Sequence, residues 1–373
     1  MSNFTSRPVL RWVVPAAAAV AVVGAGVAAK TLAVAAEPDL PPRTAAQLLV
    51  DLQTARLDGL SGTVVEHADL GLPAIPLLTG DQSAKLTSLV SGKHTLRVWY
   101  SGPDKARVSL LGSQGQSDII HNGADTWFWD SQAKEAQHYK GDPGTEHPGA
   151  LPSPTDLPKS PQEAADLALK AIDPTTQVTT GNSAKIAGRN AYELVLRPRD
   201  TSALVGEVRL AIDAQEKLPL RVQVLARGAA NPAFEVGFTS VSFARPDDAE
   251  FAFNPPAGTK VTEGDPAKAA QAQQDKAQQK DGDKADKPKT AVIGTGWTSV
   301  FVIRSSGADS GANADDAKKA QDAIGQLPTG NGGRTFNSKL VSVLFTDDGR
   351  VLIGSVTPEK LAQVAADPAA QLK

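Results

Sequence analysis

The chain has 373 residues, enough for one large domain or two ordinary ones, and its charges nearly balance at a formal net charge of -3. This balance argues against a nucleic-acid-binding protein, which carries a surplus of basic residues on one face. Cysteine is absent, which excludes disulfides, cysteine-ligated metals, thiol nucleophiles and a lipid anchor on the chain itself.

Residues 1–36 have the pattern of an export signal. Arg7 and Arg11 precede an uncharged apolar stretch at 12–29, and small residues follow at 33–35. A basic start, an apolar centre and a small-residue cleavage site are typical of a secretory signal peptide. The alternative is a retained N-terminal anchor, for which the stretch is short and rich in alanine. Cleavage is the favoured interpretation, and both place the body of the protein outside the cytoplasmic membrane.

The body of the chain predicts many short strands and about four helices. The helices are expected over 44–57, 81–90, 160–172 and from 357 onward. Short runs with alternating apolar residues, separated by Gly, Asn and Asp turns, predict antiparallel strands. These runs cover 62–67, 94–100, 107–111, 117–121, 126–130, 137–140, 191–197, 206–212, 220–225, 234–243, 297–303, 339–345 and 351–356. Because strands and helices do not alternate regularly, we predict an α+β fold.

A change in composition divides the body in two. Apart from alanine, residues 264–290 contain no apolar side chain that could enter a core, so they are predicted to form a disordered polar linker. The main domain is expected over 37–263. The C-terminal extension, 291–373, is rich in β patterns and is expected to add strands to the same sheet.

The chain shows no pattern of catalytic or metal-binding residues. No two histidines have the i, i+4 spacing of a helical zinc site, and no nucleophile elbow or phosphate-binding loop is present. The histidines are His67, His94, His121, His138 and His147. We therefore expect a binding protein and not an enzyme, with no cofactor and no metal.

Three segments carry a resemblance to a known family. Residues 210–222 contain a strand, an Asp turn and a second strand that begins Leu-Pro-Leu-Arg. Residues 118–130 form an Asn-Gly hairpin with a Trp-rich second strand, and 238–241 with 251–256 give Phe-x-x-Val followed by Phe-x-Phe-x-Pro-Pro. In this order, over about 44–261, the segments resemble the bacterial LolA-like lipoprotein carriers and the related sigma-factor regulatory protein RseB.

The resemblance implies a LolA-like open antiparallel half-barrel, with helices that cover its apolar concave face. Lipid acyl chains, or an apolar peptide segment, would bind between the sheet and these helices. The chain departs from the family in its tail beyond the linker. It also has no cysteine, so it is not itself one of the lipid-anchored relatives.

The candidate ligand-binding residues lie in two of the predicted strands. They are Leu96, Val98, Trp99, Tyr100, Trp127, Phe128 and Trp129. Alternation puts Trp99 opposite the other three residues of its strand, and Phe128 opposite the two tryptophans beside it. The pattern leaves open which face is concave. Trp127 and Trp129 are favoured because they are large and amphipathic; the alternative is that all seven belong to a closed core.

Three functional interpretations follow. The first is a carrier that holds a lipid or lipoprotein acyl moiety in the cell envelope. The second is a regulatory binder in the manner of RseB, with a membrane anti-sigma factor as its partner. The third is a structural or interaction domain without a ligand. None of them involves nucleic acid.

Overall fold

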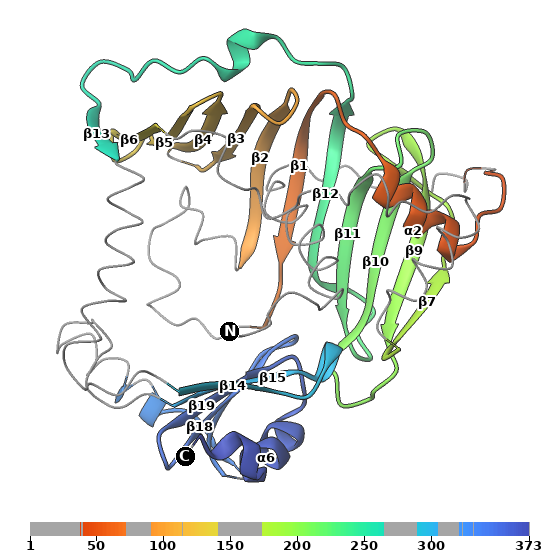
Figure 1. Cartoon of the computed structure of the whole chain (residues 1–373), viewed down its shortest axis with the longest axis vertical. Helices are drawn as coiled ribbons and strands as arrows, with labels where there is room; N and C mark the ends of the chain where they lie inside the picture. Colours follow the sequence, from red (N-terminus) through yellow and green to blue (C-terminus); the bar gives the residue numbers. More distant parts are fainter. Residues whose placement is uncertain are drawn as a thin grey trace, which may run out of the picture.

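The computed structural model describes residues 40–71, 91–113, 115–140, 174–264, 289–304, 324–330 and 332–372, together with positions 38, 321 and 322 (Figure 1). The expected signal peptide, residues 265–288 of the expected linker, and the expected helices at 81–90 and 160–172 lie outside these ranges. In the described part, neither α-helix has the length and apolar content that a membrane span requires.

Most of the described chain forms one large sheet of 13 strands. Its strands are β1 (Leu60–Ala68), β2 (Gly92–Tyr100), β3 (Lys105–Leu111), β4 (Gln116–Asn122), β5 (Asp125–Asp130), β6 (Glu135–Lys140), β7 (Thr176–Thr180), β8 (Ala184–Ile186), β9 (Arg189–Pro198), β10 (Val205–Asp213), β11 (Pro219–Ala226), β12 (Pro232–Ser242) and β13 (Lys260–Gly264). Their order is β13-β6-β5-β4-β3-β2-β1-β12-β11-β10-β9-β7, with β8 paired to β9. Pairing is antiparallel except where β13 joins β6 in parallel. The first and last strands of this order, β13 and β7, are not paired with each other, so the sheet is open.

The large sheet bends, and its two faces are covered differently (Figure 1). Helix α2 (Ala45–Thr54) begins at Thr44, whose side chain and that of Gln47 form a capping box. Its buried Leu48 and Leu49 pack against Leu194 of β9 and Ile212 of β10. We call the sheet face that contacts α2 the inner face, and the opposite one the outer face.

A crossing segment covers the outer face of strands β3–β6. After β12, the chain passes through the 3-10 helix η3 (Asp248–Phe251) and reaches β13 at the sheet edge, on the outside of the bend (Figure 1). Phe251 is 1% exposed, and η3 contacts β3 and β4. Arg107 of β3 donates a hydrogen bond to the carbonyl oxygen of Glu250 at 3.0 Å. The crossing segment is therefore an integral part of the fold.

The C-terminal strands form a sheet of their own, which corrects the expectation that they extend the first one. They are β14 (Lys289–Ile293), β15 (Val300–Arg304), β16 (Thr329–Gly330), β17 (Gly333–Asn337), β18 (Ser342–Thr346) and β19 (Arg350–Gly354), in the order β14-β15-β19-β18-β17-β16. One reason is that β13 already occupies the β6 edge of the large sheet. A second is that these strands bury their own core, including Val302, Leu344 and Leu352, together with Leu361 of α6 (Pro358–Ala366).

Backbone hydrogen bonds join the small sheet to the large one. An isolated antiparallel bridge links Ala203, after β9, to Val356, before α6. The amide of Leu204 donates to the carbonyl of Ser355 at 2.9 Å, and that of Thr357 to the carbonyl of Ser202 at 2.9 Å. Side chains also join the two sheets: Trp297 Nε1 donates to Thr176 Oγ1 at 2.7 Å, and Lys339 Nζ donates to Asp69 Oδ2 at 2.6 Å.

Candidate functional site

The inner face carries an apolar row that runs across β2–β5. In this row, Val98 lies opposite Val108, Val108 opposite Ile119, and Ile119 opposite Phe128. Val98 is 1% exposed and Phe128 is 41% exposed. The row therefore runs from the buried centre of the sheet out to an accessible aromatic side chain.

Other side chains on the same face extend this apolar surface. Leu96 and Leu110 pair across β2 and β3 and form a small buried cluster. Tyr139 of β6 meets Phe128 edge-on, with ring centroids 5.7 Å apart. Tyr100 packs against the main core, and burial, followed by the charges of Asp58 and Asp104, raises its pKa. The phenol is therefore neutral at physiological pH.

The tryptophans expected at the site lie on the outer face. Trp127 stacks on the ring of His138, with centroids 3.9 Å apart and an interplanar angle of 10°. Both Trp127 and Trp129 contact Phe253 of the crossing segment, at 5.3 Å and 5.8 Å between centroids. The ring centroid of Trp99, on the same face, lies 5.5 Å from Cζ of the Arg107 guanidinium. These aromatic rings pack beneath or beside the segment that crosses the outer face.

The structure thus divides the seven predicted residues between the two faces. Leu96, Val98, Tyr100 and Phe128 are on the inner face, and Trp99, Trp127 and Trp129 are on the outer one. The sequence analysis did not include Val108 and Ile119, which complete the apolar row. The hairpin turn at Asn122 and Asp125 was the signal that could have found Ile119, since it fixes Ile119 opposite Phe128.

A buried acid–imidazole pair lies on the inner face beside the apolar row. Glu66 of β1 is 2% exposed, and its Oε2 lies 2.8 Å from Nδ1 of His94, the opposite residue on β2. Burial raises the pKa of Glu66, and the hydrogen bond and charge of His94 act against that shift. A carboxyl group in such a place is costly to bury unless all of its oxygens are paired.

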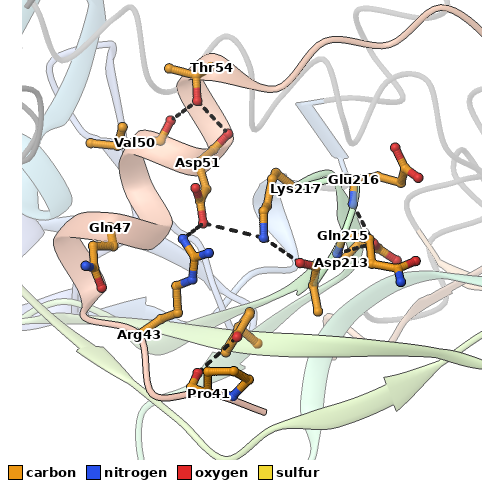
Figure 2. A network of polar contacts seen from close by, with 12 residues as sticks. Pro41, Arg43, Gln47, Val50, Asp51, Thr54, Asp213, Gln215, Glu216 and Lys217 are labelled. Carbon is orange, nitrogen blue, oxygen red and sulfur yellow. Dashed lines mark hydrogen bonds and ion pairs between the residues drawn. The ribbon is translucent and has the colours of Figure 1, made fainter. Parts of the chain in front are cut away.

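A second polar network fastens α2 over the inner face (Figure 2). The Asp51 carboxylate lies 2.9 Å from Arg43 Nη1 and 3.9 Å from Lys217 Nζ. Lys217 belongs to the β10–β11 turn, where it has a positive φ of 63° and hydrogen-bonds the Ala214 carbonyl. Tyr192 donates to the Pro41 carbonyl at 3.0 Å. The network thus joins two parts of the chain to the sheet: helix α2, through Asp51, and the segment before it, through Pro41.

The remaining polar features are separate from the apolar row. A shallow depression of about 350 Å³ lies over β7–β10 on the outer face, where Arg197 and Arg209 both pair with Glu207. Within the described ranges, no three His, Cys, Asp or Glu side chains gather closely enough to hold a metal ion.

Comparisons with known proteins return solved structures only; no family model and no curated protein matches the chain. The Pseudomonas aeruginosa MucA/MucB complex is similar at 15% identity and a TM-score of 0.41, over 86% of this chain and 96% of the other. A LolA superfamily protein from Nitrosomonas europaea is similar at 12% identity and a TM-score of 0.22, over 57% and 99%. These similarities are distant, at 16% identity or less and TM-scores of 0.41 or less, so the site is argued from this chain's own residues.

Proposed function

We propose that this protein is a non-enzymatic binding protein of the cell envelope that holds the acyl chain of a lipid or lipoprotein on the inner face of its large sheet. The observation that carries the proposal is the apolar row from Val98 to Phe128, which ends in an aromatic side chain that is 41% exposed. Val108 and Ile119 are half-buried beside it, so the accessible end of the row is a contiguous apolar surface, the kind of feature at which proteins bind apolar ligands.

The energetics require such a surface. Each methylene withdrawn from water contributes about 0.8 kcal/mol, so a sixteen-carbon chain needs roughly 12 kcal/mol of apolar contact. Four strands at a spacing of about 4.8 Å make the row about 14 Å long from Val98 to Phe128. This length matches most of an extended acyl chain, and Leu96, Leu110 and Tyr100 widen the strip.

The experiment compares two exposed apolar positions on opposite faces. Phe128→Asp puts a charge on the inner face, and Val261→Asp puts one at a residue of β13 that is 43% exposed and shares the outer face with Ala136. Both side chains are well exposed, so both variants are expected to fold. Binding of a fluorescent sixteen-carbon fatty acid is measured on protein that begins at Glu37 and is purified without detergent.

We expect Phe128→Asp to weaken binding at least tenfold and Val261→Asp to leave it within twofold of the original. Native mass spectrometry of the same samples should show a bound acyl species only where affinity is retained. Equal affinity in both variants, or no binding by the original protein, would contradict the proposal and favour a domain without a ligand.

One observation supports a second candidate function, the binding of an apolar segment from the outer portion of a membrane protein. The face of the small sheet opposite α6 carries Val292, 57% exposed, directly across from Phe301, 42% exposed. The row continues across the sheet through Ile353 and Val343. A photo-crosslinking residue at 301 tests this function: it should capture one membrane protein, and Val292→Asp should prevent capture whereas Phe128→Asp should not.

A further inference from the structure

Three carboxylates are buried in the large sheet, and two of them have both oxygens paired. The buried residues are Glu66, Asp118 and Asp213, at 2%, 2% and 1% exposure. Asp118 accepts hydrogen bonds from Arg107 and Gln116, each at 2.6 Å and each on a different oxygen. Asp213 accepts from Arg189 on both oxygens and from the amides of Gln215 and Glu216 at 2.8 Å and 2.7 Å. These two carboxylates have evident structural roles.

Glu66 differs because only one of its oxygens has a partner. Oε2 meets His94 Nδ1 at 2.8 Å, whereas Oε1 is buried and makes no hydrogen bond within the part of the chain that the structure describes. A buried acceptor left without a donor is unfavourable, and native structures rarely retain one without a reason. The unpaired Oε1 therefore indicates that a hydrogen-bond donor from outside these described residues completes it.

The surroundings of Glu66 on the inner face are otherwise apolar. Val64 and Ala68 flank it along β1 at 0% and 5% exposure, and Val236 lies opposite it on β12 at 3%. The neighbouring charged positions on these strands, His67, Lys93 and Glu235, point to the outer face because they alternate with the inner-face residues. His94 is thus the polar neighbour of Glu66 on its own face among these paired positions.

When a single proton is shared between Oε2 of Glu66 and Nδ1 of His94, Oε1 carries no hydrogen and is an acceptor, whichever of the two atoms holds the proton. In this protonation state, the group that completes Oε1 is a donor. His94 lies four residues along β2 from Val98, about 13 Å at 3.3 Å per residue, with Leu96 between them on the same face. An acyl chain that leaves the row at Val98 and follows β2 over Leu96 would bring its polar end to Glu66.

We propose that Glu66 Oε1 accepts a hydrogen bond from an N–H or O–H group beside the acyl chain of the ligand, so that the protein prefers N-acyl or hydroxyacyl compounds to simple acyl esters. The inference rests on the proposed function, since it assigns the polar end of the same site. Glu66 is then the residue that determines specificity, and the apolar row supplies affinity that all acyl chains share.

The test uses uncharged probes that share one acyl length. They are methyl palmitate, which has no donor, N-palmitoylglycine methyl ester, which has an amide N–H, and methyl 3-hydroxypalmitate, which has a hydroxyl. Each displaces the fluorescent fatty acid from the original protein and from three variants. Glu66→Met removes the acceptor at similar volume, Glu66→Gln retains one acceptor oxygen, and Asp213→Asn alters a fully paired carboxylate at a distance from Glu66 in the sheet.

We expect the original protein to bind at least one donor probe tenfold more tightly than methyl palmitate; the better of the two identifies the ligand as an N-acyl or a hydroxyacyl compound. Glu66→Met should reduce the preference to within twofold without weakening methyl palmitate, and Glu66→Gln and Asp213→Asn should keep most of it. Equal binding of all three probes by the original protein, or a preference that persists in Glu66→Met, would overturn the inference while leaving the proposed function intact. Failure of every probe to bind would instead overturn both.

Discussion

Phe251 allows the assignment of the two sheet faces to be tested through stability. Its side chain is the largest of those that are less than 2% exposed in the described part of the chain, and it belongs to η3, which contacts strands β3 and β4. Burying a phenylalanine removes on the order of 150 Å² of apolar surface from water, which at ~25 cal/mol per Å² amounts to about 4 kcal/mol. Phe251→Ala should therefore lower the free energy of unfolding by about 3–5 kcal/mol.

The assay is urea unfolding followed by tryptophan fluorescence, because Trp127 and Trp129 contact Phe253, two residues beyond the substitution. The matched control is Phe253→Ala, which removes a half-buried ring from the same segment. Its expected cost is about 1–2 kcal/mol, from the two ring contacts and a smaller buried area. The folded Phe251→Ala protein should still bind the fluorescent fatty acid, because the outer face is not the proposed ligand surface.

Two results would refute this reasoning. A cost below about 1 kcal/mol for Phe251→Ala would mean that η3 does not cover the sheet as an integral layer. Loss of fatty-acid binding by protein that is still folded would mean that the ligand lies on the outer face, with Trp127 and Trp129, as the sequence analysis favoured.

Three further predictions concern the small sheet. Leu361→Ala removes a side chain that is completely buried and should cost about 3 kcal/mol; hydrogen exchange should accelerate in β18 and β19, and unchanged exchange would contradict the assigned core. Although partial burial acts in the opposite direction, hydrogen bonds from Arg350 and Thr346 lower the pKa of Asp348 from 3.8 to about 2. The stability that this ionised group provides should be fully present above pH 4 and lost as the pH falls to 2; a thermal scan over this range should show a smaller loss in Asp348→Asn, and identical pH profiles would contradict the assignment. Gly333 has a φ of 147°, and a Cβ there would lie 2.1 Å from the Phe345 carbonyl oxygen. Gly333→Ala should therefore cost about 2 kcal/mol in urea unfolding, whereas Gly349→Ala, with a φ of 81° and open space, should cost about 1 kcal/mol; equal costs would show that the close contact is unimportant.

The sequence by itself determined the local elements with strong patterns. The helix expected over 44–57 is α2, begun by the capping box at Thr44, and the helix expected from 357 is α6, capped by Thr357. The alternating run at 206–212 lies within β10, and the paired runs at 117–121 and 126–130 form the β4–β5 hairpin. These elements could be predicted because side-chain period, caps and tight turns act over a few residues.

The strands of the described part that the sequence analysis did not predict are β7, β8, β13, β14, β16 and β17. Of these, β7 and β13 are short and rich in polar or charged residues. They are strands because an adjacent edge offers hydrogen bonds; β13, for example, pairs in parallel with β6. No property of five polar residues contains this information, because the partner edge is assembled from distant parts of the chain.

For the candidate site, alternation divided the residues correctly into two sets but could not say which set faced inward. Alternation places Phe128 opposite Trp127 and Trp129, but the sequence does not show which of these side chains lie on the inner face. Packing decided it: α2 covers one face, and the crossing segment with Phe251 covers the other. The same holds for Glu66 and His94, which are 28 residues apart and meet only through the register of β1 with β2. Period and turn chemistry are local, so the sequence predicts the strands that have strong patterns, whereas the edge strands and the inner face form only when distant segments pack on the sheet.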